Sequence, residues 1–345
     1  MRHRATPRRC CGPASAIFSD DAGVAIVTSG RVVALCGGVG GAKLALGLAS
    51  VLPPGALTVV VNTGDDFEHL ALHVSPDLDT VLYTLAGLND AERGWGRAGE
   101  TWHFMQALAA LGGETWFALG DRDLALHVER TRRLRGGETL TAIVRDMAAR
   151  LGVATDIVPM SDDPVRTNVH TRDGTLPFQH YFVKHRCEPV VTGVSFDGAA
   201  GARANPVFFE ALLAPSLAAV VICPSNPYLS IDPILAVPGV REALQRAAAP
   251  VVAVSPIIGG QAVKGPTAKI MRELKIAVTN REICRHYAEL IDGLVIDTAD
   301  AADAERVGVT VVVTRTLMTS LDDRRDLARA VLAFAERLAK ELATA

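Results

Sequence analysis

The sequence predicts an α/β fold with a Rossmann-like, mostly parallel sheet flanked by helices, together with an inserted, smaller β-rich or mixed subdomain. From residue 31 onward, short β-branched runs alternate with amphipathic helical stretches, which is typical of βαβ units. Half of the 345 residues are hydrophobic but only 5% are aromatic, a balance that favours buried parallel strands covered by helices. A glycine-rich segment after the first apolar run indicates a ligand-binding turn at the sheet edge.

The regular elements follow from the spacing of the apolar residues. Compact apolar runs predict strands at residues 32–35, 57–61, 115–118, 219–223, 251–254, 294–296 and 309–313. Helical spacing predicts helices at residues 42–52, 80–85, 101–111, 140–151, 266–274 and 281–291. A last helix follows Ser320, which with Asp323 forms a capping-box pattern. Its apolar stripe of Leu327, Val331, Phe334 and Leu338 predicts core packing.

Residues 158–198, approximately, interrupt this alternation. Segments 165–171, 178–184 and 190–194 are typical of β structure and are joined by Asp-Gly and Pro turns without intervening helices. We therefore expect one nucleotide-binding α/β domain over residues 31–345 with an antiparallel insertion. Residues 1–30 carry several arginines but no apolar core of a signal peptide, and we expect a disordered extension there.

Charge and cysteine usage exclude several classes of function. The net charge is −3, so the overall charge balance does not indicate a nucleic-acid binder. No apolar run approaches the roughly 20 residues that span a bilayer, so no membrane segment is expected. The six cysteines show no metal-binding spacing and are typical of reduced thiols in a cytoplasmic protein. A small-molecule ligand is the remaining expectation.

The glycine run consists of Gly37, Gly38, Gly40 and Gly41 and is followed by Lys43. Missing β-carbons let backbone N–H groups approach a phosphate, and the next helix N-terminus adds partial positive charge. The run matches neither a Walker A loop nor the G-x-G-x-x-G fingerprint. A glycine-rich turn that only allows close strand and helix packing is the alternative.

Two adjacent acids, Asp65 and Asp66, follow the second strand in the segment Asn-Thr-Gly-Asp-Asp. They are expected at the carboxyl edge of the sheet, beside the glycine run. Mg²⁺ prefers one or two carboxylates together with water and phosphate oxygens, which makes a magnesium site the functional interpretation. The alternative, structural interpretation is a turn in which both acids are solvated.

Asp77 and Asp79 lie near the same edge, at the start of a predicted helix. They are candidates for metal ligation. Equally, Ser75 is a suitable N-cap, Pro76 suits the first helical position, and both acids would favour the helix dipole. Both interpretations remain open from the sequence.

Three further loops offer polar side chains for a ligand. Arg97 follows Trp95, and an aromatic with a cation can orient a planar heterocycle, although core packing of Trp95 is the simpler expectation. Ser225 and Asn226 follow the strand at 219–223, and Lys264 follows the strand at 251–254. They are candidate donors to a nucleotide, with ordinary turn chemistry as the alternative.

Taken in order, these motifs resemble the 2-phospho-L-lactate transferase family of coenzyme F-420 biosynthesis. The motifs are Gly-Gly-Val-Gly-Gly-Ala-Lys at 37–43, Asn-Thr-Gly-Asp-Asp at 62–66, Ser-Pro-Asp-Leu-Asp at 75–79, Trp-Gly-x-x-x-Glu-Thr at 95–101, Ser-Asn-Pro-Tyr at 225–228 and Ala-Val-Lys-Gly-Pro at 262–266. The resemblance covers roughly residues 32–319.

The resemblance implies transfer of a phospho-acid group from a guanosine diphospho-acid donor to the deazaflavin Fo, with release of GMP and with Mg²⁺ as cofactor. Asp65 and Asp77 are then the metal ligands, and Asp66 orients the acceptor or serves as a base. The glycine run and Lys43 would hold the donor phosphates. Arg97, Ser225, Asn226 and Lys264 would line the donor and acceptor sites. A cytoplasmic homodimer is compatible with this family, and the acid can be lactyl, enolpyruvyl or glyceryl.

Two other functions compete with this one. A nucleotide-sugar-binding regulatory protein of the gluconeogenesis-factor type shares the glycine run and the paired acids. It typically continues with a Gly-Gly-Ser-type loop, whereas this chain continues with Phe67-Glu68-His69. A nicotinamide dehydrogenase is disfavoured because the dinucleotide fingerprint is defective.

Overall fold

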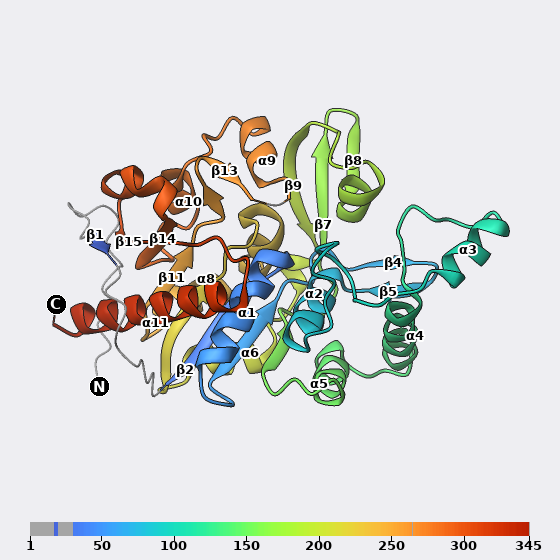
Figure 1. Ribbon diagram of the computed structural model, residues 1–345, viewed down its shortest axis with the longest axis horizontal. Coiled ribbons are helices and arrows are strands. Elements are labelled where there is room, and N and C mark those ends of the chain that lie inside the picture. The colour runs from blue at the N-terminus through green and yellow to red at the C-terminus, as the bar shows by residue number, and fades with distance from the viewer. Residues whose placement is uncertain (1–16, 20–29, 264, 345) are drawn as a thin grey trace.

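The computed structural model describes residues 17–19, 30–263 and 265–344, and it is built around one eight-stranded parallel sheet (Figure 1). The strand order is β1-β15-β14-β11-β10-β2-β3-β6. The strands are β1 (Ile17–Ser19), β2 (Arg31–Cys36), β3 (Leu57–Val61), β6 (Asp156–Pro159), β10 (Leu217–Ile222), β11 (Val251–Val254), β14 (Gly293–Asp297) and β15 (Thr310–Thr314). Every neighbouring pair in this sheet is parallel, which confirms the predicted fold class.

Helices cover both faces of the sheet. One layer contains α1 (Gly38–Val51), α2 (Pro76–Leu85), α5 (Leu140–Arg150) and α11 (Leu321–Thr344). The other contains α6 (Pro206–Leu213), α7 (Asp232–Leu235), α8 (Val240–Arg246), α9 (Thr267–Glu273) and α10 (Asn280–His286). Along β2, Val32 and Ala34 face the first layer, whereas Val33 and Leu35 face the second. Both faces are buried, which explains the continuous apolar strands.

The strand order reverses between β2 and β10. From β2 the chain proceeds outward to β3 and β6, and it then returns to β10 and proceeds in the opposite direction through β11, β14 and β15. The loops after β2 and β10 therefore diverge to opposite sides of the sheet. In doubly wound folds this divergence opens the crevice in which ligands bind.

A three-stranded antiparallel sheet forms the insertion, in the order β8-β7-β9. Its strands are β7 (Arg166–Thr171), β8 (Gly174–Pro177) and β9 (Val191–Asp197). Val158, where the sequence suggested that the insertion begins, belongs to β6 of the central sheet. The strand predicted at 178–184 is wrong, because His180–Lys184 form a π-helical turn. Phe178 and Phe182, four residues apart, stack with ring centroids at 5.3 Å, which is the contact expected at helical spacing.

An arm extends from the sheet and is visible at the right of Figure 1. It contains the hairpin β4 (Phe67–His69) and β5 (Leu72–Val74), and helices α3 (His103–Ala110) and α4 (Asp121–Arg135). The strand predicted at 115–118 is wrong, since this segment is a loop between α3 and α4. Its aromatic residues pack on β4 instead of entering the sheet, with Phe117 edge-on to Phe67 at 4.8 Å.

The C-terminal helix α11 closes the fold as predicted. Ser320 Oγ accepts a hydrogen bond from the Asp323 N–H at 3.0 Å, and Asp323 Oδ2 accepts one from the Ser320 N–H at 2.8 Å, which confirms the capping box. The stripe from Leu327 to Leu338 is buried. The disordered extension expected over residues 1–30 lies outside the described residues except at Gly30 and in β1. Within the described part of the chain, no helix has the length and apolarity to cross a bilayer.

Candidate active site

A cavity of about 700 Å³ opens at the carboxyl edge of the sheet, above the divergence of the β2 and β10 loops. Nine of the candidate ligand-binding residues from the sequence line it: Gly37, Gly38, Gly40, Lys43, Asp65, Asp77, Asp79, Ser225 and Asn226. Gly41, Asp66 and Arg97 do not line its wall. Lys264 lies outside the described residues. Loops widely separated in the sequence therefore meet at one edge, as parallel strand order requires.

The glycine run is the first turn of α1, because the helix begins at Gly38 and not near Ala42. Gly38 has a φ of 63°, the left-handed region that favours glycine, and its N–H donates to Asp77 Oδ1 at 2.6 Å. A β-carbon at Gly40 would stand 2.6 Å from the Pro224 carbonyl oxygen. Glycine thus permits close packing here and also exposes a helix N-terminus, whose first N–H groups have no partner within the helix. The two interpretations of the run are compatible.

Asn62 connects the two acids expected to bind metal. Its Nδ2 donates to Asp65 Oδ1 at 3.1 Å, to Asp77 Oδ2 at 3.0 Å and, less closely, to the Leu229 carbonyl oxygen. Asp65 is 5% exposed and Asp77 is 7% exposed. Burial, and then the charges of Asp77 and Asp66, hold the pKa of Asp65 well above its ordinary value. Burial likewise raises the pKa of Asp77 to about 6. A cation between them would offset this cost.

Asp66 lies behind this pair and is 2% exposed. Ser75 Oγ donates to Asp66 Oδ2 at 2.9 Å, and His73 Nε2 lies 3.1 Å from the same oxygen. Ser75 occupies the N-cap position of α2 as predicted, but its side chain makes no capping hydrogen bond. Pro76 does occupy the first helical turn as predicted. Through these contacts Asp66 holds the residues that lead into α2, and it does not line the cavity itself.

Ser225 and Asn226 organise the opposite lip of the cavity. The Gly37 N–H donates to Ser225 Oγ at 3.1 Å, and the Ser225 hydroxyl donates to the Gly37 carbonyl at 2.8 Å. Asn226 Oδ1 accepts hydrogen bonds from the N–H groups of Tyr228 and Leu229, and its Nδ2 is buried without a hydrogen-bond partner in the described structure. The lip therefore retains one buried donor beside the cavity.

Lys43 lies on α1 at the same wall of the cavity. Its Nζ donates to the Met318 carbonyl oxygen at 2.7 Å. This contact fixes a cationic group at the cavity edge, adjacent to the glycine turn.

Aromatic side chains form the part of the cavity nearest the arm. Trp95, Trp116, Phe117, Phe178 and Phe182 line it. Trp95 is 49% exposed, so the core packing expected for it is wrong, and the Arg93 guanidinium lies 5.5 Å from its ring centroid. An apolar, aromatic wall with few polar groups suits a planar ligand.

Arg97 lies beside this wall and not on it. It forms an isolated β-bridge with Asn89, and its Nε is buried without a hydrogen-bond partner within the described residues. A ligand role for Arg97 would require that its side chain turn toward the cavity.

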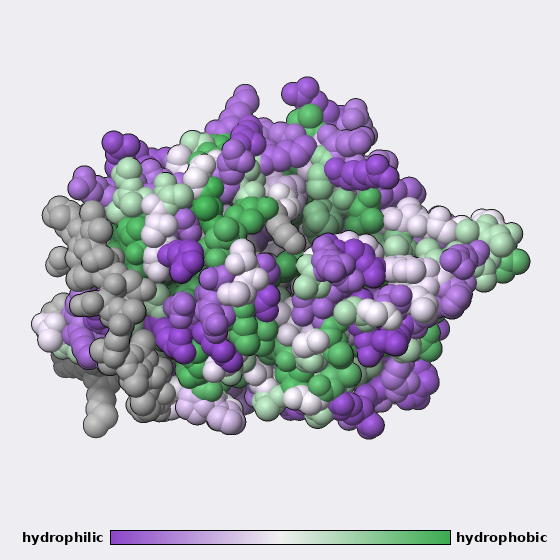
Figure 2. All heavy atoms as spheres, viewed as in Figure 1, coloured by the Kyte–Doolittle hydropathy of each residue, from purple (hydrophilic) through white to green (hydrophobic). Residues whose placement is uncertain are grey.

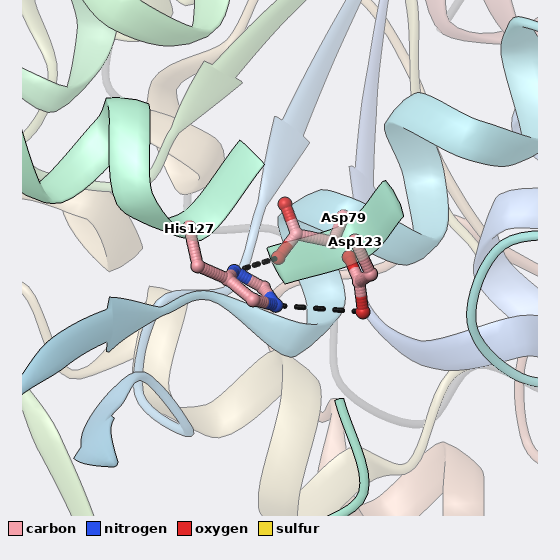
Figure 3. A group of neighbouring side chains, drawn as sticks. All are labelled: Asp79, Asp123 and His127. Atoms are coloured by element: carbon pink, nitrogen blue, oxygen red, sulfur yellow. Dashed lines mark ion pairs between the residues drawn. The ribbon is translucent and has the colours of Figure 1, made fainter. Parts of the chain in front are cut away.

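A further polar cluster of the wall was missed by the sequence reasoning. Asp123 and His127 project from α4 toward Asp79 of α2, and all three line the cavity (Figure 3). Asp79 pairs with the buried Arg130 guanidinium. The available signal was the four-residue spacing of Asp123 and His127, which places both on one helix face. The sequence did not predict a helix over residues 121–135, so this spacing did not indicate a shared helix face.

Known proteins provide an independent comparison. The family model described as 2-phospho-L-lactate transferase CofD matches residues 32–325. A phosphoenolpyruvate transferase of Streptomyces griseus is 41% identical over 317 residues, which cover 89% of this chain and 99% of that protein. A 2-phospho-L-lactate transferase of Methanosarcina acetivorans is 40% identical over 304 residues, covering 87% and 98%.

The fold also has a solved counterpart. A crystal structure of a UPF0052 family protein from Bacillus halodurans superposes with a TM-score of 0.57 over 88% of this chain and 98% of its own, at 16% identity. At this level of identity the likeness concerns the fold alone.

Proposed function

Because this chain belongs to the 2-phospho-L-lactate transferase CofD family, we propose that it transfers a phospho-acid group from a guanosine diphospho-acid donor to the deazaflavin Fo. Membership in the family makes it a transferase of phospho-acid groups in coenzyme F-420 biosynthesis. The guanosine donor, the Fo acceptor and the need for Mg²⁺ are parts of the proposal.

The proposed reaction needs no covalent enzyme intermediate. A ribityl hydroxyl oxygen of Fo attacks the donor phosphorus that carries the acid, and a new P–O bond forms. The bond from this phosphorus to the bridging oxygen breaks, so that GMP leaves with the electron pair, and the hydroxyl proton passes to a base or to water. Alignment and charge neutralisation supply most of the catalysis in such transfers.

The glycine turn supports a donor site at the β2–β10 divergence. The α1 N-terminus at Gly38 offers backbone N–H groups and partial positive charge, and Lys43 adds a cation at the same wall. Ser225 fixes the turn from the opposite lip. These groups would hold the diphosphate, with Asn226 Nδ2 as a further donor.

Asp65 and Asp77 fit a Mg²⁺ ion. Two buried carboxylates with raised pKa values, joined by one amide, form an oxygen-only donor set, and the charge of Arg166 offsets the burial of Asp65 only in part. The metal would supply charge neutralisation to the diphosphate. The single observation that carries the proposal is this Asn62-bridged pair beside the glycine turn.

The aromatic wall supports an acceptor site next to the donor site. Trp116, Phe117 and Phe178 offer flat apolar surface for the deazaflavin ring. Asp66, expected from the sequence to be the base or the group that orients the acceptor, is separated from the cavity wall, so we propose instead that it supports the start of α2 through Ser75 and His73.

The test is a direct transfer assay. The purified chain is incubated with Fo, Mg²⁺ and, separately, the lactyl, enolpyruvyl and glyceryl guanosine diphospho-acids, because relatives with different acids are similar to nearly the same degree. Mass spectrometry is expected to show a phospho-acid adduct of Fo and one equivalent of GMP with at least one donor. No adduct with any donor, together with tight binding of a UDP-sugar, would overturn the proposal in favour of a regulatory protein. Light scattering of the same sample tests the homodimer, which we also propose.

A cytoplasmic location is the last part of the proposal. Cys36, Cys187 and Cys223 form no disulfide in the described structure. Free thiols suit a reducing compartment.

A further inference from the structure

The cavity wall contains a second group of potential metal ligands, chemically unlike the Asp65 and Asp77 pair. His127 and Asp123 on α4, together with Asp79 on α2, present ligand atoms that lie within 4.8 Å of one another. Figure 3 shows the His127 ring facing the two carboxylates, with one ion pair from each ring nitrogen. All three residues line the cavity.

The buried imidazole of His127 is the observation that indicates a bound ligand. Its side chain is 1% exposed, and neither ring nitrogen has a hydrogen-bond partner in the described structure. Nδ1 lies 3.7 Å from Asp79 Oδ2, and Nε2 lies 3.4 Å from Asp123 Oδ2. A neutral imidazole has one N–H, so one nitrogen lone pair necessarily faces a carboxylate oxygen. Burying two such lone pairs face to face is costly unless a proton or a cation lies between them.

Both carboxylates are held by other donors in the orientation that a metal ligand needs. The Tyr83 hydroxyl donates to Asp123 Oδ1 at 2.6 Å, which leaves Oδ2 directed at His127. Arg130 donates to both oxygens of Asp79. Metal-binding carboxylates are usually hydrogen-bonded in this way, and metal-binding histidines usually donate their second N–H to a carboxylate. Asp79 is placed to accept such a bond from Nδ1.

We propose that His127 Nε2 and Asp123 Oδ2 bind a divalent transition-metal ion, with Asp79 orienting the imidazole. With ligand bonds of about 2.1 Å, their 3.4 Å separation corresponds to an angle of about 110° at the metal, close to tetrahedral. The remaining positions face the cavity and are open to water or to a ligand oxygen.

The chemistry of the donors selects the ion. Imidazole suits Mn²⁺, Fe²⁺, Co²⁺ and Zn²⁺ better than Mg²⁺, which prefers oxygen ligands. The charge also permits a cation: Asp79 and Asp123 contribute two negative charges and Arg130 one positive charge around a neutral imidazole. The nitrogen-containing site and the oxygen-only pair of Asp65 and Asp77 are therefore expected to prefer different metals.

Pulsed EPR of bound Mn²⁺ tests the proposal without relying on transferase activity. The full chain is freed of metal, dialysed and loaded with more than two equivalents of Mn²⁺. A ¹⁴N modulation from a coordinated imidazole is expected, and it should persist in Asp65→Asn, which alters only the oxygen site. His127→Gln and the isosteric Asp123→Asn should abolish it, and Asp79→Asn should weaken the underlying Mn²⁺ affinity by about 10- to 100-fold.

His170→Gln is the matched control. His170 lies on the insertion, hydrogen-bonded to Thr175, and its loss should leave the ¹⁴N modulation unchanged. Far-UV circular dichroism identifies the variants that fold. If His127→Gln does not fold, Asp123→Asn provides the test in its place. Absence of ¹⁴N modulation in the loaded parent chain, or its persistence in folded Asp123→Asn, would overturn the proposal. Neither outcome bears on whether the chain transfers a phospho-acid.

Discussion

Ser225 and Gly37 hydrogen-bond to each other in both directions although they lie 188 positions apart in the chain. This pair joins the loops after β10 and β2, and it sets the shape of the turn proposed to hold the donor diphosphate. Ser225 is 3% exposed, so the Gly37 N–H and carbonyl groups cannot hydrogen-bond to water instead if the Ser225 hydroxyl is removed.

Replacing Ser225 by Ala should therefore harm both stability and donor binding. A buried backbone N–H left without an acceptor costs roughly 1–3 kcal/mol, and we expect a donor KM raised about 10-fold with a smaller change in kcat. Steady-state kinetics and thermal melting measure both. Ser50→Ala is the control, because its hydroxyl donates to the Leu46 carbonyl on an exposed helix surface. An unchanged donor KM in Ser225→Ala would remove this loop from the donor site.

Gly40→Ala should distort the same turn by a steric route. The new β-carbon would meet the Pro224 carbonyl oxygen at 2.6 Å, so the backbone of one loop must move. We expect a loss of roughly 1–3 kcal/mol and weaker donor binding, measured by denaturant unfolding and by calorimetry with GDP. Gly201→Ala is the matched control, since a β-carbon there meets nothing within 4 Å. Equal stability of the two variants would contradict the packing role of Gly40.

Asp77 should make the metal-free protein less stable as the pH rises. Burial raises its pKa from 3.8 to about 6, so the folded chain holds the proton more tightly than the unfolded chain does. The resulting stabilisation is complete below pH 3.8 and is lost as the pH rises through about 6. Relative to Asp77→Asn, the parent chain should lose on the order of 1–3 kcal/mol of unfolding free energy between pH 4 and 7.

Mg²⁺ should reverse this loss in the parent chain and not in Asp77→Asn, because the ion favours the ionised carboxylate. Denaturant unfolding across this pH range, with and without Mg²⁺, measures the difference. Parallel pH profiles for the two proteins would show that Asp77 is not the titrating group.

Asp65 and Asp66 should differ in the way that their substitution acts. Asp65 lies on the cavity wall, and Asp65→Asn should lower kcat by about 100-fold or more and shift the Mg²⁺ dependence. Asp66→Asn alters the support that Ser75 and His73 give to α2, so we expect mainly a lower melting temperature, by roughly 2–6 °C. A larger fall in kcat for Asp66→Asn, with loss of the acidic limb of the pH–rate profile, would restore Asp66 as the general base.

Trp116 should contribute to acceptor binding and not to donor binding. It lines the cavity and is held edge-on by His69 and His180. Trp116→Leu should raise the KM for Fo by about 10-fold, the loss expected for one aromatic contact of about 1–1.5 kcal/mol, with the donor KM unchanged as the internal control. If both KM values rise together, Trp116 acts on the fold of the arm and not on the acceptor.

Much of the central sheet could be predicted because its strands are buried on both faces. Residues 57–61 and 251–254 have the predicted bounds in the structure, since each is a short continuous apolar run, as expected for a strand that is buried on both faces. The same argument failed at 115–118, where Trp116 and Phe117 have high β-propensity but pack on a neighbouring hairpin. Local propensity alone did not distinguish a core strand from an aromatic loop.

The polar core of the arm could not be predicted from apolar spacing. The residues that α4 buries are His127, Arg130 and Thr131, so the segment has no apolar stripe. Their burial depends on Asp79 and Tyr83, which belong to another helix. The ion pairs that compensate for it exist only after the chain has folded.

The candidate site was predictable to the extent that it lies at strand ends. Asp65 and Ser225 each follow a strand of the parallel sheet, so their presence at one edge followed from the fold class. The three contacts of Asn62 could not be foreseen, because they depend on side-chain directions set by packing. For the same reason the separation of Asp66 from the cavity became visible only in the structure.

The adjacency of β2 and β10 also has a consequence for biosynthesis of the chain. The glycine turn leaves the ribosome early, but Ser225 is added 188 positions after Gly37, which at about 5–20 residues per second is a delay of roughly 10–40 s. Throughout that interval one edge of β2 has no native neighbour, and an unpaired strand edge promotes aggregation. The polypeptide therefore acquires the pocket proposed for the donor late, and a nascent chain arrested before β10 should depend on a chaperone to stay in solution.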